Sequence, residues 1–161
     1  MKKLLFMLVV TMISIATISA QESKKTERKA KKEQRIQQNM KEVFDAFSAN
    51  DLTFVPTEMS TNTSARIQIN DYYYLKLEPK YISIDLPYLT FNGSLQVATT
   101  IFEVVKKEQT NDGYLMTLKV LANNTYYNIT LNTNSKNNLT NVTIETTGSS
   151  GITYTGTVRP N

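Results

Sequence analysis

Residues 114–159 alternate apolar and polar side chains with a period of two, in four successive runs. Neighbouring side chains of an extended strand point to opposite faces, so this period places each apolar set on one face of a strand. Turn-forming residues separate the runs at positions 123–124, 132–138 and 148–151. The pattern therefore predicts an antiparallel meander that has one apolar face and one face rich in Thr and Asn.

Shorter runs between residues 52 and 106 continue the same rhythm. We expect strands at residues 52–55, 66–70, 72–77, 82–86 and 101–106, with a short strand or bend at 95–97. Proline is expected to end the first strand at Pro56 and the fourth at Pro87, and residues 57–64 are expected to form a polar loop. Asp112-Gly113, between two strand-like runs, carries the strongest hairpin signal in the chain.

A helix is predicted before these strands. Apolar residues recur at helical spacing near its end, at Ile36, Met40, Val43, Phe44 and Phe47. This spacing predicts an amphipathic helix whose last turns pack on the sheet, and Asn50-Asp51 is expected to end it. The predicted fold class is therefore all-β, a single antiparallel sandwich or partly open barrel of about eight strands with one N-terminal helix.

The first residues have the features of a secretory signal peptide. Lys2-Lys3 is followed by the apolar run 4–18 and by Ser19-Ala20, so we assign residues 1–20 to a signal peptide. The alternative is a retained membrane anchor, but the apolar run is shorter than the ~20 residues of a spanning helix. The chain has no cysteine to carry a lipid. We therefore expect an exported protein, periplasmic or secreted, that is soluble after cleavage.

The positive charge of the chain is concentrated before the predicted sheet. Residues 21–42, a basic and largely helical arm, carry eight Lys/Arg against four Glu, whereas residues 43–161, the all-β domain, carry eight Lys/Arg against ten Asp/Glu. Nucleic-acid binding would require a basic folded face, so we expect no nucleic-acid partner. The arm is predicted to be a solvated helix, or alternatively to make a weak contact with an anionic membrane surface.

The chain has no cysteine, histidine or tryptophan, and these absences exclude several kinds of chemistry. Ser-His and Cys-His nucleophile pairs and the usual His/Cys zinc sites cannot form. We therefore expect no catalytic residue, no metal site and no cofactor, and we predict that the protein is not an enzyme. The least expected alternative is a carboxylate-dependent hydrolase that uses Asp71, Glu78 and Asp85. It is remote because nothing in the sequence indicates that two of these acids lie close together.

Tyrosines cluster in the first half of the predicted sheet. Tyr72, Tyr74, Tyr81 and Tyr88 are candidate binding residues, since a tyrosine ring offers an apolar face and a hydroxyl group. The alternative is that they are ordinary strand residues. In the same region we expect Ile82, Ile84 and Leu86 to face inward and Tyr88 to lie at the rim of the sheet.

Two stretches carry a resemblance to a known family. They are Tyr-Leu-Lys-Leu-Glu-Pro-Lys-Tyr-Ile-Ser-Ile-Asp-Leu-Pro-Tyr at 74–88, and the tail with Tyr-Tyr-Asn-Ile-Thr-Leu at 126–131 and Ile-Thr-Tyr-Thr-Gly at 152–156. Over residues 24–158 the chain resembles domain-of-unknown-function family 4251, small secreted proteins of Bacteroidetes-type bacteria. The family usually continues past Leu-Pro-Tyr with a Gly-rich stretch, which is shorter here at 89–93. The resemblance implies an exported protein and a fold, and it offers no activity to transfer.

These observations favour a non-catalytic protein of the cell envelope, secreted or periplasmic, that binds a small apolar or glycan-like ligand or a protein partner. The alternative is a structural or assembly factor of the envelope. An enclosed apolar cavity in the structure would favour a small ligand, whereas a filled core with an exposed apolar patch would favour a partner.

Overall fold

Hydrogen bonds between the first and last strands close the sheet into a barrel. The computed structural model describes residues 2–61, 66–88, 93–147 and 151–161, without the side chains of residues 2–24, 61, 88, 93 and 94. Its elements are α1 (Lys2–Ala49), β1 (Leu52–Thr61), β2 (Ile67–Gln68), β3 (Tyr74–Leu77), β4 (Tyr81–Tyr88), β5 (Gly93–Gln109), β6 (Gly113–Ala122), β7 (Thr125–Asn134), β8 (Leu139–Thr146) and β9 (Ile152–Pro160).

The barrel contains eight antiparallel strands, β1 and β3 to β9, and β2 is an extra strand that pairs with β1. The prediction of an all-β fold with one N-terminal helix is confirmed. The alternatives of a sandwich or a partly open barrel are corrected, because β1 pairs with β9 along its whole length, from Leu52↔Pro160 to Thr61↔Ile152. The predicted meander is also confirmed, since β5 to β9 follow one another in the sheet.

The chain divides into two compact units, Met1–Gln38 and Asn39–Asn161. The barrel and the last turns of α1 belong to the second unit. In the described part of the chain, no helix has both the length and the apolar character needed to cross a membrane.

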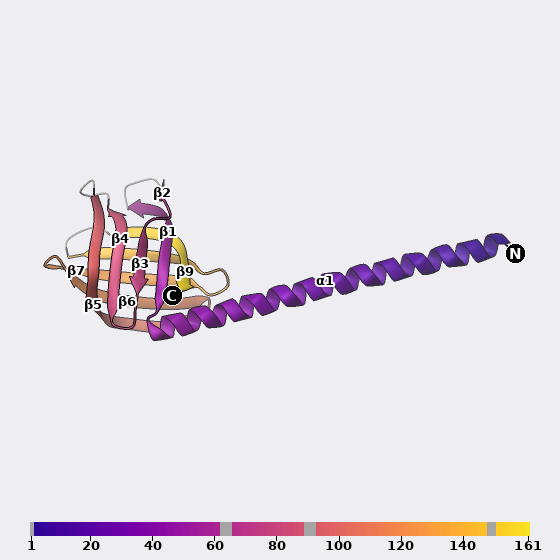
Figure 1. The fold of residues 1–161 in the computed structure, drawn as a ribbon, viewed down its shortest axis with the longest axis horizontal. Coiled ribbons are helices and arrows are strands. Elements are labelled where there is room, and N and C mark those ends of the chain that lie inside the picture. The colour runs from indigo at the N-terminus through magenta and orange to yellow at the C-terminus, as the bar shows by residue number, and fades with distance from the viewer. Residues whose placement is uncertain (1, 62–65, 89–92, 148–150) are drawn as a thin grey trace. The chain divides into compact units, whose positions relative to one another are not determined.

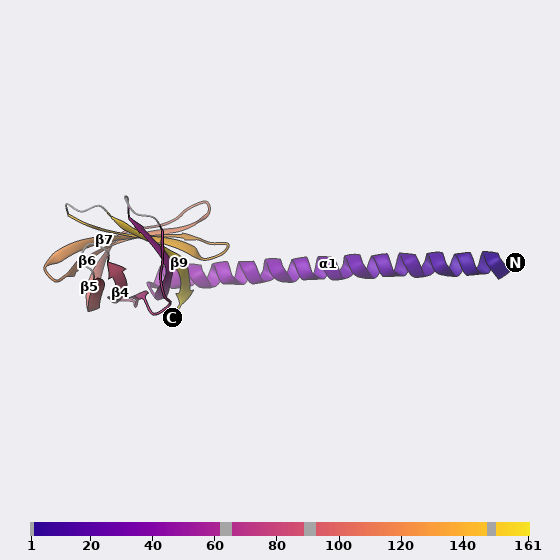
Figure 2. The ribbon, with the colours of Figure 1, turned by 90° about the horizontal axis from the view of Figure 1, so that it is seen from above.

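Bulges in β5 and β1 allow the sheet to bend sharply enough to close into a barrel. Figure 1 shows β1, β3, β4 and β5 running across the direction of β6 to β9, and Figure 2 shows β4 and β5 nearly end-on beside the second group. β5 pairs with β4 through residues 93–101 and with β6 through residues 102–109. Bulges interrupt β5 between Val104 and Lys106, and β1 between Pro56 and Glu58. An extra residue bends a strand and increases its twist, which is the geometry that a closed barrel requires.

The prolines do not end the strands in which they lie, contrary to the prediction. β1 continues through Pro56 to Thr61, so the expected polar loop begins later, and β4 continues through Pro87 to Tyr88. Pro56 adjoins the bulge, and Pro87 lies beyond the last residue of β4 that pairs with β3, Asp85. Both positions need no ladder hydrogen bond from the proline nitrogen, so proline is tolerated there.

Side chains from every barrel strand fill the interior. Fully buried examples are Phe54, Leu75, Ile82, Met116, Leu118, Ile129, Leu131 and Tyr154. An eight-stranded barrel has an interior just wide enough for such side chains to fill. As predicted, Ile82, Ile84 and Leu86 face this core, while the side chain of Tyr88 lies outside the described residues.

The last turns of α1 pack on the barrel and end where the sequence predicts. Val43, Ala46 and Phe47 are buried in the core, although Phe44 stays 42% exposed. Asn50 has a positive φ of 56°, its N–H donates to the Phe47 carbonyl at 3.3 Å, and the Asp51 N–H donates to the Ala46 carbonyl at 2.9 Å. This pair of bonds is a Schellman C-cap, which satisfies carbonyl groups that the helix leaves free.

Lys107 fixes the same helix end to β5. Its Nζ donates to the Ser48 carbonyl and to Asn50 Oδ1, both at 2.8 Å. A cation at a helix C-terminus is favourable because the carbonyl groups there carry a partial negative charge. Burial lowers the pKa of Lys107.

The two stretches that carry the family resemblance meet inside the barrel. The hydroxyl of Tyr154 on β9 donates to the carbonyl of Pro87 on β4 at 2.7 Å, although 67 positions separate them. This bond gives the buried phenol a partner and joins β4 to β9, two strands that are not neighbours in the sheet. The Leu-Pro-Tyr step and the Ile-x-Tyr-x-Gly close therefore have a shared structural role.

We expect Tyr154→Phe to lower the free energy of unfolding by about 1 kcal/mol, because the Pro87 carbonyl loses its donor while the ring still fills the core. Urea denaturation of both proteins would measure the difference. Tyr126→Phe is the matched control, since Tyr126 is about half exposed. An equal loss in both variants would contradict the role of the Tyr154 hydroxyl.

Candidate functional site

Four large apolar side chains form a row on the outer face of the barrel, and we call them the outer apolar row. One comes from each of four neighbouring strands, β4 to β7: Tyr81 (46% exposed), Ile101 (70%), Leu121 (49%) and Tyr126 (52%). Tyr81 pairs with Ile101, and Leu121 pairs with Tyr126. The β5–β6 pairing begins at Phe102↔Val120, and Ile101 and Leu121 are the next residues of β5 and β6 beyond this pair. The row therefore consists of two cross-strand pairs, Tyr81↔Ile101 and Leu121↔Tyr126, on either side of the place where β5 joins β6.

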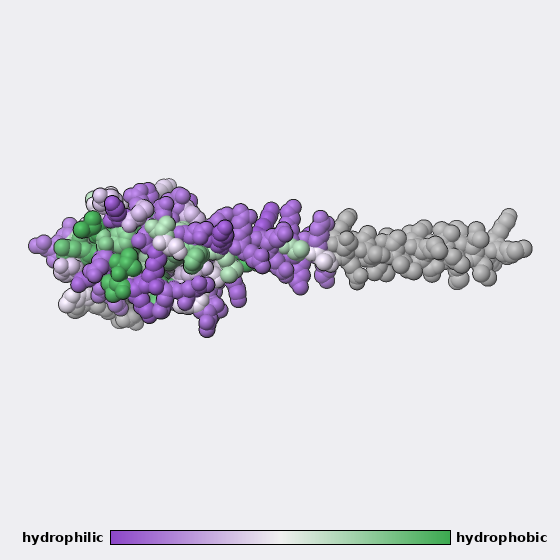
Figure 3. Space-filling model, turned by 90° about the horizontal axis from the view of Figure 1, so that it is seen from below, coloured by the Kyte–Doolittle hydropathy of each residue, from purple (hydrophilic) through white to green (hydrophobic). Residues whose placement is uncertain are grey.

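The rest of the outer face is mainly polar. Hydroxyl groups meet across strands at Ser83–Thr99 (3.1 Å), Thr117–Thr130 (3.3 Å) and Thr143–Thr153 (3.2 Å). Such Thr and Ser pairs stabilise a solvated strand face. Apolar residues in register across four strands are an exception to that pattern. Figure 3 shows one face of the molecule on which hydrophobic surface, in green, interrupts the hydrophilic surface.

One end of the outer apolar row carries a positive charge. The Nζ of Lys119 lies 4.6 Å from the centre of the Tyr126 ring. A cation over an aromatic face holds the ring in place and leaves its other side available. The row thus combines aliphatic surface at its centre, a tyrosine at each end and an ammonium group beside one tyrosine.

The structure does not gather the four tyrosines proposed from the sequence. Tyr72 lies exposed in the turn before β3, Tyr74 lies on β3, and Tyr81 begins β4. Tyr74 pairs with Asp85, which is four residues along β4 from Tyr81, so about 13 Å separates their backbone positions. The side chain of Tyr88 is outside the described residues. Tyr81 alone joins the outer apolar row.

The carboxylates considered for catalysis are also apart. Glu78 lies at the turn of the β3–β4 hairpin and accepts from Lys76 Nζ at 2.9 Å. Asp85 lies four strand positions further along the hairpin, so about 13 Å separates the backbone positions of the two acids. Among the described residues no group of three acidic side chains could hold a metal ion.

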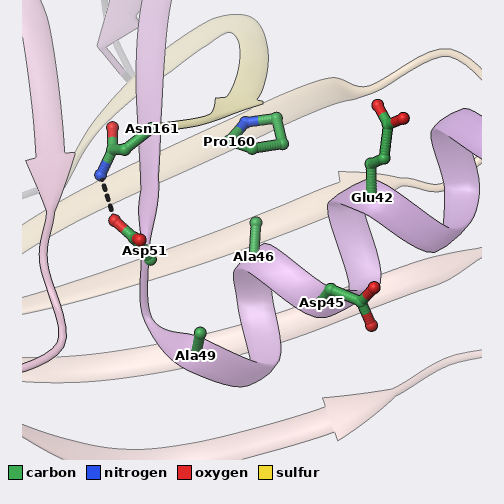
Figure 4. Close-up of a pocket in the computed structure, with 7 residues that line it drawn as sticks. All are labelled: Glu42, Asp45, Ala46, Ala49, Asp51, Pro160 and Asn161. Carbon is green, nitrogen blue, oxygen red and sulfur yellow. Dashed lines mark hydrogen bonds between the residues drawn. The ribbon is translucent and has the colours of Figure 1, made fainter.

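Three hollows lie beside the end of α1 in the described part of the chain, and one of them, of about 280 Å³, is lined by Met40, Lys41, Phe44, Gln109 and Tyr114. Figure 4 shows the first, of about 390 Å³, lined by Glu42, Asp45, Ala46, Ala49, Asp51, Pro160 and Asn161. Asp51 is already engaged, because it accepts from Asn161 Nδ2 at 2.7 Å. The same amide group also donates to the Leu77 carbonyl at 2.7 Å. These bonds hold together the end of β9, β3 and the residue that follows the helix, so the polar groups of the hollow have a structural role.

The second hollow, of about 180 Å³, is lined by three aromatic rings and by polar and aliphatic residues: Phe44, Phe47, Tyr114, Ser48, Lys107, Glu108, Gln109 and Leu115. Tyr114 stacks on Phe47 and is tilted against Phe44, with both pairs of ring centres 5.6 Å apart. Burial, followed by the charge of Asp45, raises the pKa of Tyr114. This volume is below the range of about 300 to 1,000 Å³ usual for a small-molecule site. The rings therefore serve mainly to seat the helix on the barrel.

Sequence reasoning missed three members of the outer apolar row, and the reason differs between them. Leu121 and Tyr126 flank the Asn123-Asn124 turn, and the alternation of the predicted meander places both on its polar face. Ile101 could not be assigned to a face because β5 changes its pairing partner there. The available signal for the outer apolar row was the pair Leu121 and Tyr126, two apolar residues at polar-face positions on the two sides of one turn.

Comparison with known proteins identifies the chain through its family. The sequence model of the domain of unknown function DUF4251 matches residues 27–158. A crystal structure of a DUF4251 family protein from Bacteroides eggerthii superposes with a TM-score of 0.63 at 14% identity, covering 76% of this chain and 87% of that one. At this identity the likeness shows a shared fold. No curated protein matches the sequence.

The outer apolar row should be dispensable for folding. We expect Ile101→Ala to change the free energy of unfolding by less than about 0.5 kcal/mol, because the side chain is mostly solvated. The matched substitution in the core, Ile129→Ala, should cost about 2–5 kcal/mol, since it leaves a cavity. Urea denaturation measures both. A cost at Ile101 near that at Ile129 would show that the row is part of the core.

Proposed function

The chain belongs to the DUF4251 family, and we propose that it is an exported, non-catalytic protein of the cell envelope that binds a protein partner through the outer apolar row. The observation that carries this proposal is the register of Tyr81, Ile101, Leu121 and Tyr126 across four strands. The row is contiguous, exposed and bordered by polar residues, which is the character of an interaction surface.

The composition of the row supports a protein partner. Tyrosine is enriched in protein interfaces because it offers a large apolar area with little loss of side-chain entropy. Ile101, at the centre, is the most exposed of the four and would be buried by any partner that covers the row. Binding energy usually concentrates near the centre of an interface, within a rim that excludes water.

The packing of the interior supports a partner over a small apolar ligand. Leu118, Ile129 and Tyr154, from three strands, are fully buried in the barrel. An eight-stranded barrel has an interior just wide enough for side chains to fill, and burial of these residues favours packing over a ligand in the described part of the barrel. A glycan-like ligand on the tyrosines is a weaker candidate, because Tyr81 and Tyr126 are three strands apart.

The absence of catalysis rests on the chemistry of the chain. Without cysteine or histidine, the remaining general acids and bases are carboxylates, lysines and tyrosines. Glu78 is bound to Lys76, and about 13 Å separates its backbone position from that of Asp85. Export is supported by the charged start, apolar run and small residues of segment 1–20.

We expect the exported protein to begin near Gln21, because Ser19-Ala20 supplies small residues at the cleavage point. Expression in a Bacteroidetes-type host, followed by fractionation and intact-mass measurement, would test this. Recovery of the full-length chain from the membrane fraction would contradict the prediction.

A photo-crosslinking side chain at Ile101 should capture a partner in the envelope of the expressing host. The same group at Asn132, exposed on the polar outer face of β7, is the matched control and should capture little. Adding Leu121→Thr and Tyr126→Thr should abolish the adduct at Ile101 without lowering the thermal midpoint.

Three outcomes would count against the proposal. Adducts of equal yield from Ile101 and Asn132 would show random collision. An adduct that survives the two threonine substitutions would show that the row is not the contact. Protection of the row by an oligosaccharide, with no protein adduct, would favour a glycan ligand.

A further inference from the structure

Residues 25–35 of α1 carry their positive charges on one side of the helix. At 3.6 residues per turn each position advances by about 100°. On this basis one arc of about 160° around the helix contains every lysine and arginine of the segment. We call these residues the basic stripe: Lys25, Arg28, Lys29, Lys31, Lys32 and Arg35. All six side chains are exposed.

The opposite side of the same helical turns is acidic or neutral. Glu27 and Glu33 lie outside the arc of the basic stripe, and Ala30 lies opposite its centre. The two glutamates lie beside the edges of the stripe, each four residues from a lysine (Glu27 from Lys31, Glu33 from Lys29), and the arc of the stripe itself contains no acidic residue. The segregation therefore indicates a counterpart that is negative and approaches from one side.

We propose that the basic stripe binds the anionic phospholipid headgroups of a membrane surface. A flat negative surface can contact only one side of a helix, and this matches a stripe better than a flexible polyanion, which can wrap around the helix. Each Lys or Arg held near such a surface strengthens binding by roughly fivefold at low salt. The two glutamates then face away from the lipid.

The contact would be electrostatic and reversible. Residues 25–35 contain no large apolar side chain, so the helix has nothing to insert between the acyl chains. Binding should therefore weaken as ionic strength rises, because salt screens the attraction. This inference concerns residues outside the outer apolar row, so it is independent of the proposed partner binding.

The test is flotation of the full chain with vesicles that contain phosphatidylglycerol and with vesicles of phosphatidylcholine alone. The apolar run 4–18 would bind both kinds, so the readout is the ratio of the two affinities. The decisive variant carries Glu27→Arg, Arg28→Glu, Lys32→Glu and Glu33→Lys. It keeps composition and net charge but places two carboxylates within the stripe. We expect its preference for anionic vesicles to fall by roughly tenfold or more.

A second pair of variants covers the case in which the swap disturbs the helix. Arg28→Gln, Lys32→Gln and Arg35→Gln remove three charges from the stripe and should reduce the preference by roughly 100-fold. Lys80→Gln, Lys136→Gln and Arg159→Gln remove the same charge from exposed positions of the barrel unit and should leave it nearly unchanged. Circular dichroism would verify that the helix content is equal.

Two outcomes overturn the proposal. The first is a swap variant that keeps the preference of the original chain, which would show that the arrangement of charge has no role. The second is equal affinity of the original chain for the two kinds of vesicle. Binding to a soluble sulfated polysaccharide together with this equal affinity would likewise overturn the proposal, and would identify a polyanion other than lipid as the counterpart.

Discussion

The seam between β1 and β9 is the contact on which the rest of the structure depends, because it converts a curved sheet into a closed barrel. At its centre Pro56 lies opposite Gly156. A Cβ atom on Gly156 would lie 2.1 Å from the Val55 carbonyl oxygen and 2.7 Å from the Pro56 Cα, so only glycine fits there. The bulge that follows Pro56 restores the pairing, which continues to Thr61. Without the seam, β1 and β9 would each present an open edge that favours aggregation.

Closure also explains where the unusual side chains of the surface lie. β5 must leave β4 and join β6, and it does so at Ile101 and Phe102. The bulge further along β5 reverses which side chains face inward, so that Lys107 lies opposite the buried Met116. It is this reversal that brings a lysine to the end of α1. The change of partner at Ile101 and the bulge before Lys106 therefore place two different features on β5, the centre of the outer apolar row and the lysine that contacts the helix end.

The parts that could be predicted from the sequence are those governed by local chemistry. Alternation gave the strands of the meander, and Asn123 and Asn124, both at positive φ, form the predicted turn between β6 and β7. The helix end was predictable because asparagine tolerates the left-handed conformation that a C-cap needs. The closure was not, because it depends on the pairing of β1 with β9, about one hundred residues apart.

Proline was misleading for the same reason. Its effect on a strand depends on whether the neighbouring strand needs a hydrogen bond at that position, and this is a property of the sheet. At Pro87 the strand has passed the end of β3, and the Pro87 carbonyl receives the Tyr154 hydroxyl from across the barrel. In the candidate site, Tyr81 could be proposed from its residue type. Ile101 and Leu121 could be recognised as site residues only from the strand pairing, which the sequence does not show.

The distribution of charge separates the two proposed contacts. Residues 43–161 carry two more acidic than basic side chains, so an anionic surface would repel this part of the chain slightly. An attraction to lipid must then come from the arm, where Lys and Arg outnumber Glu by eight to four. Attraction and repulsion between exposed charges are both screened within about 8 Å at physiological salt, so each acts only on side chains close to a charged surface. The charge difference between residues 21–42 and 43–161 therefore makes the arm the part of the chain that an anionic surface would attract.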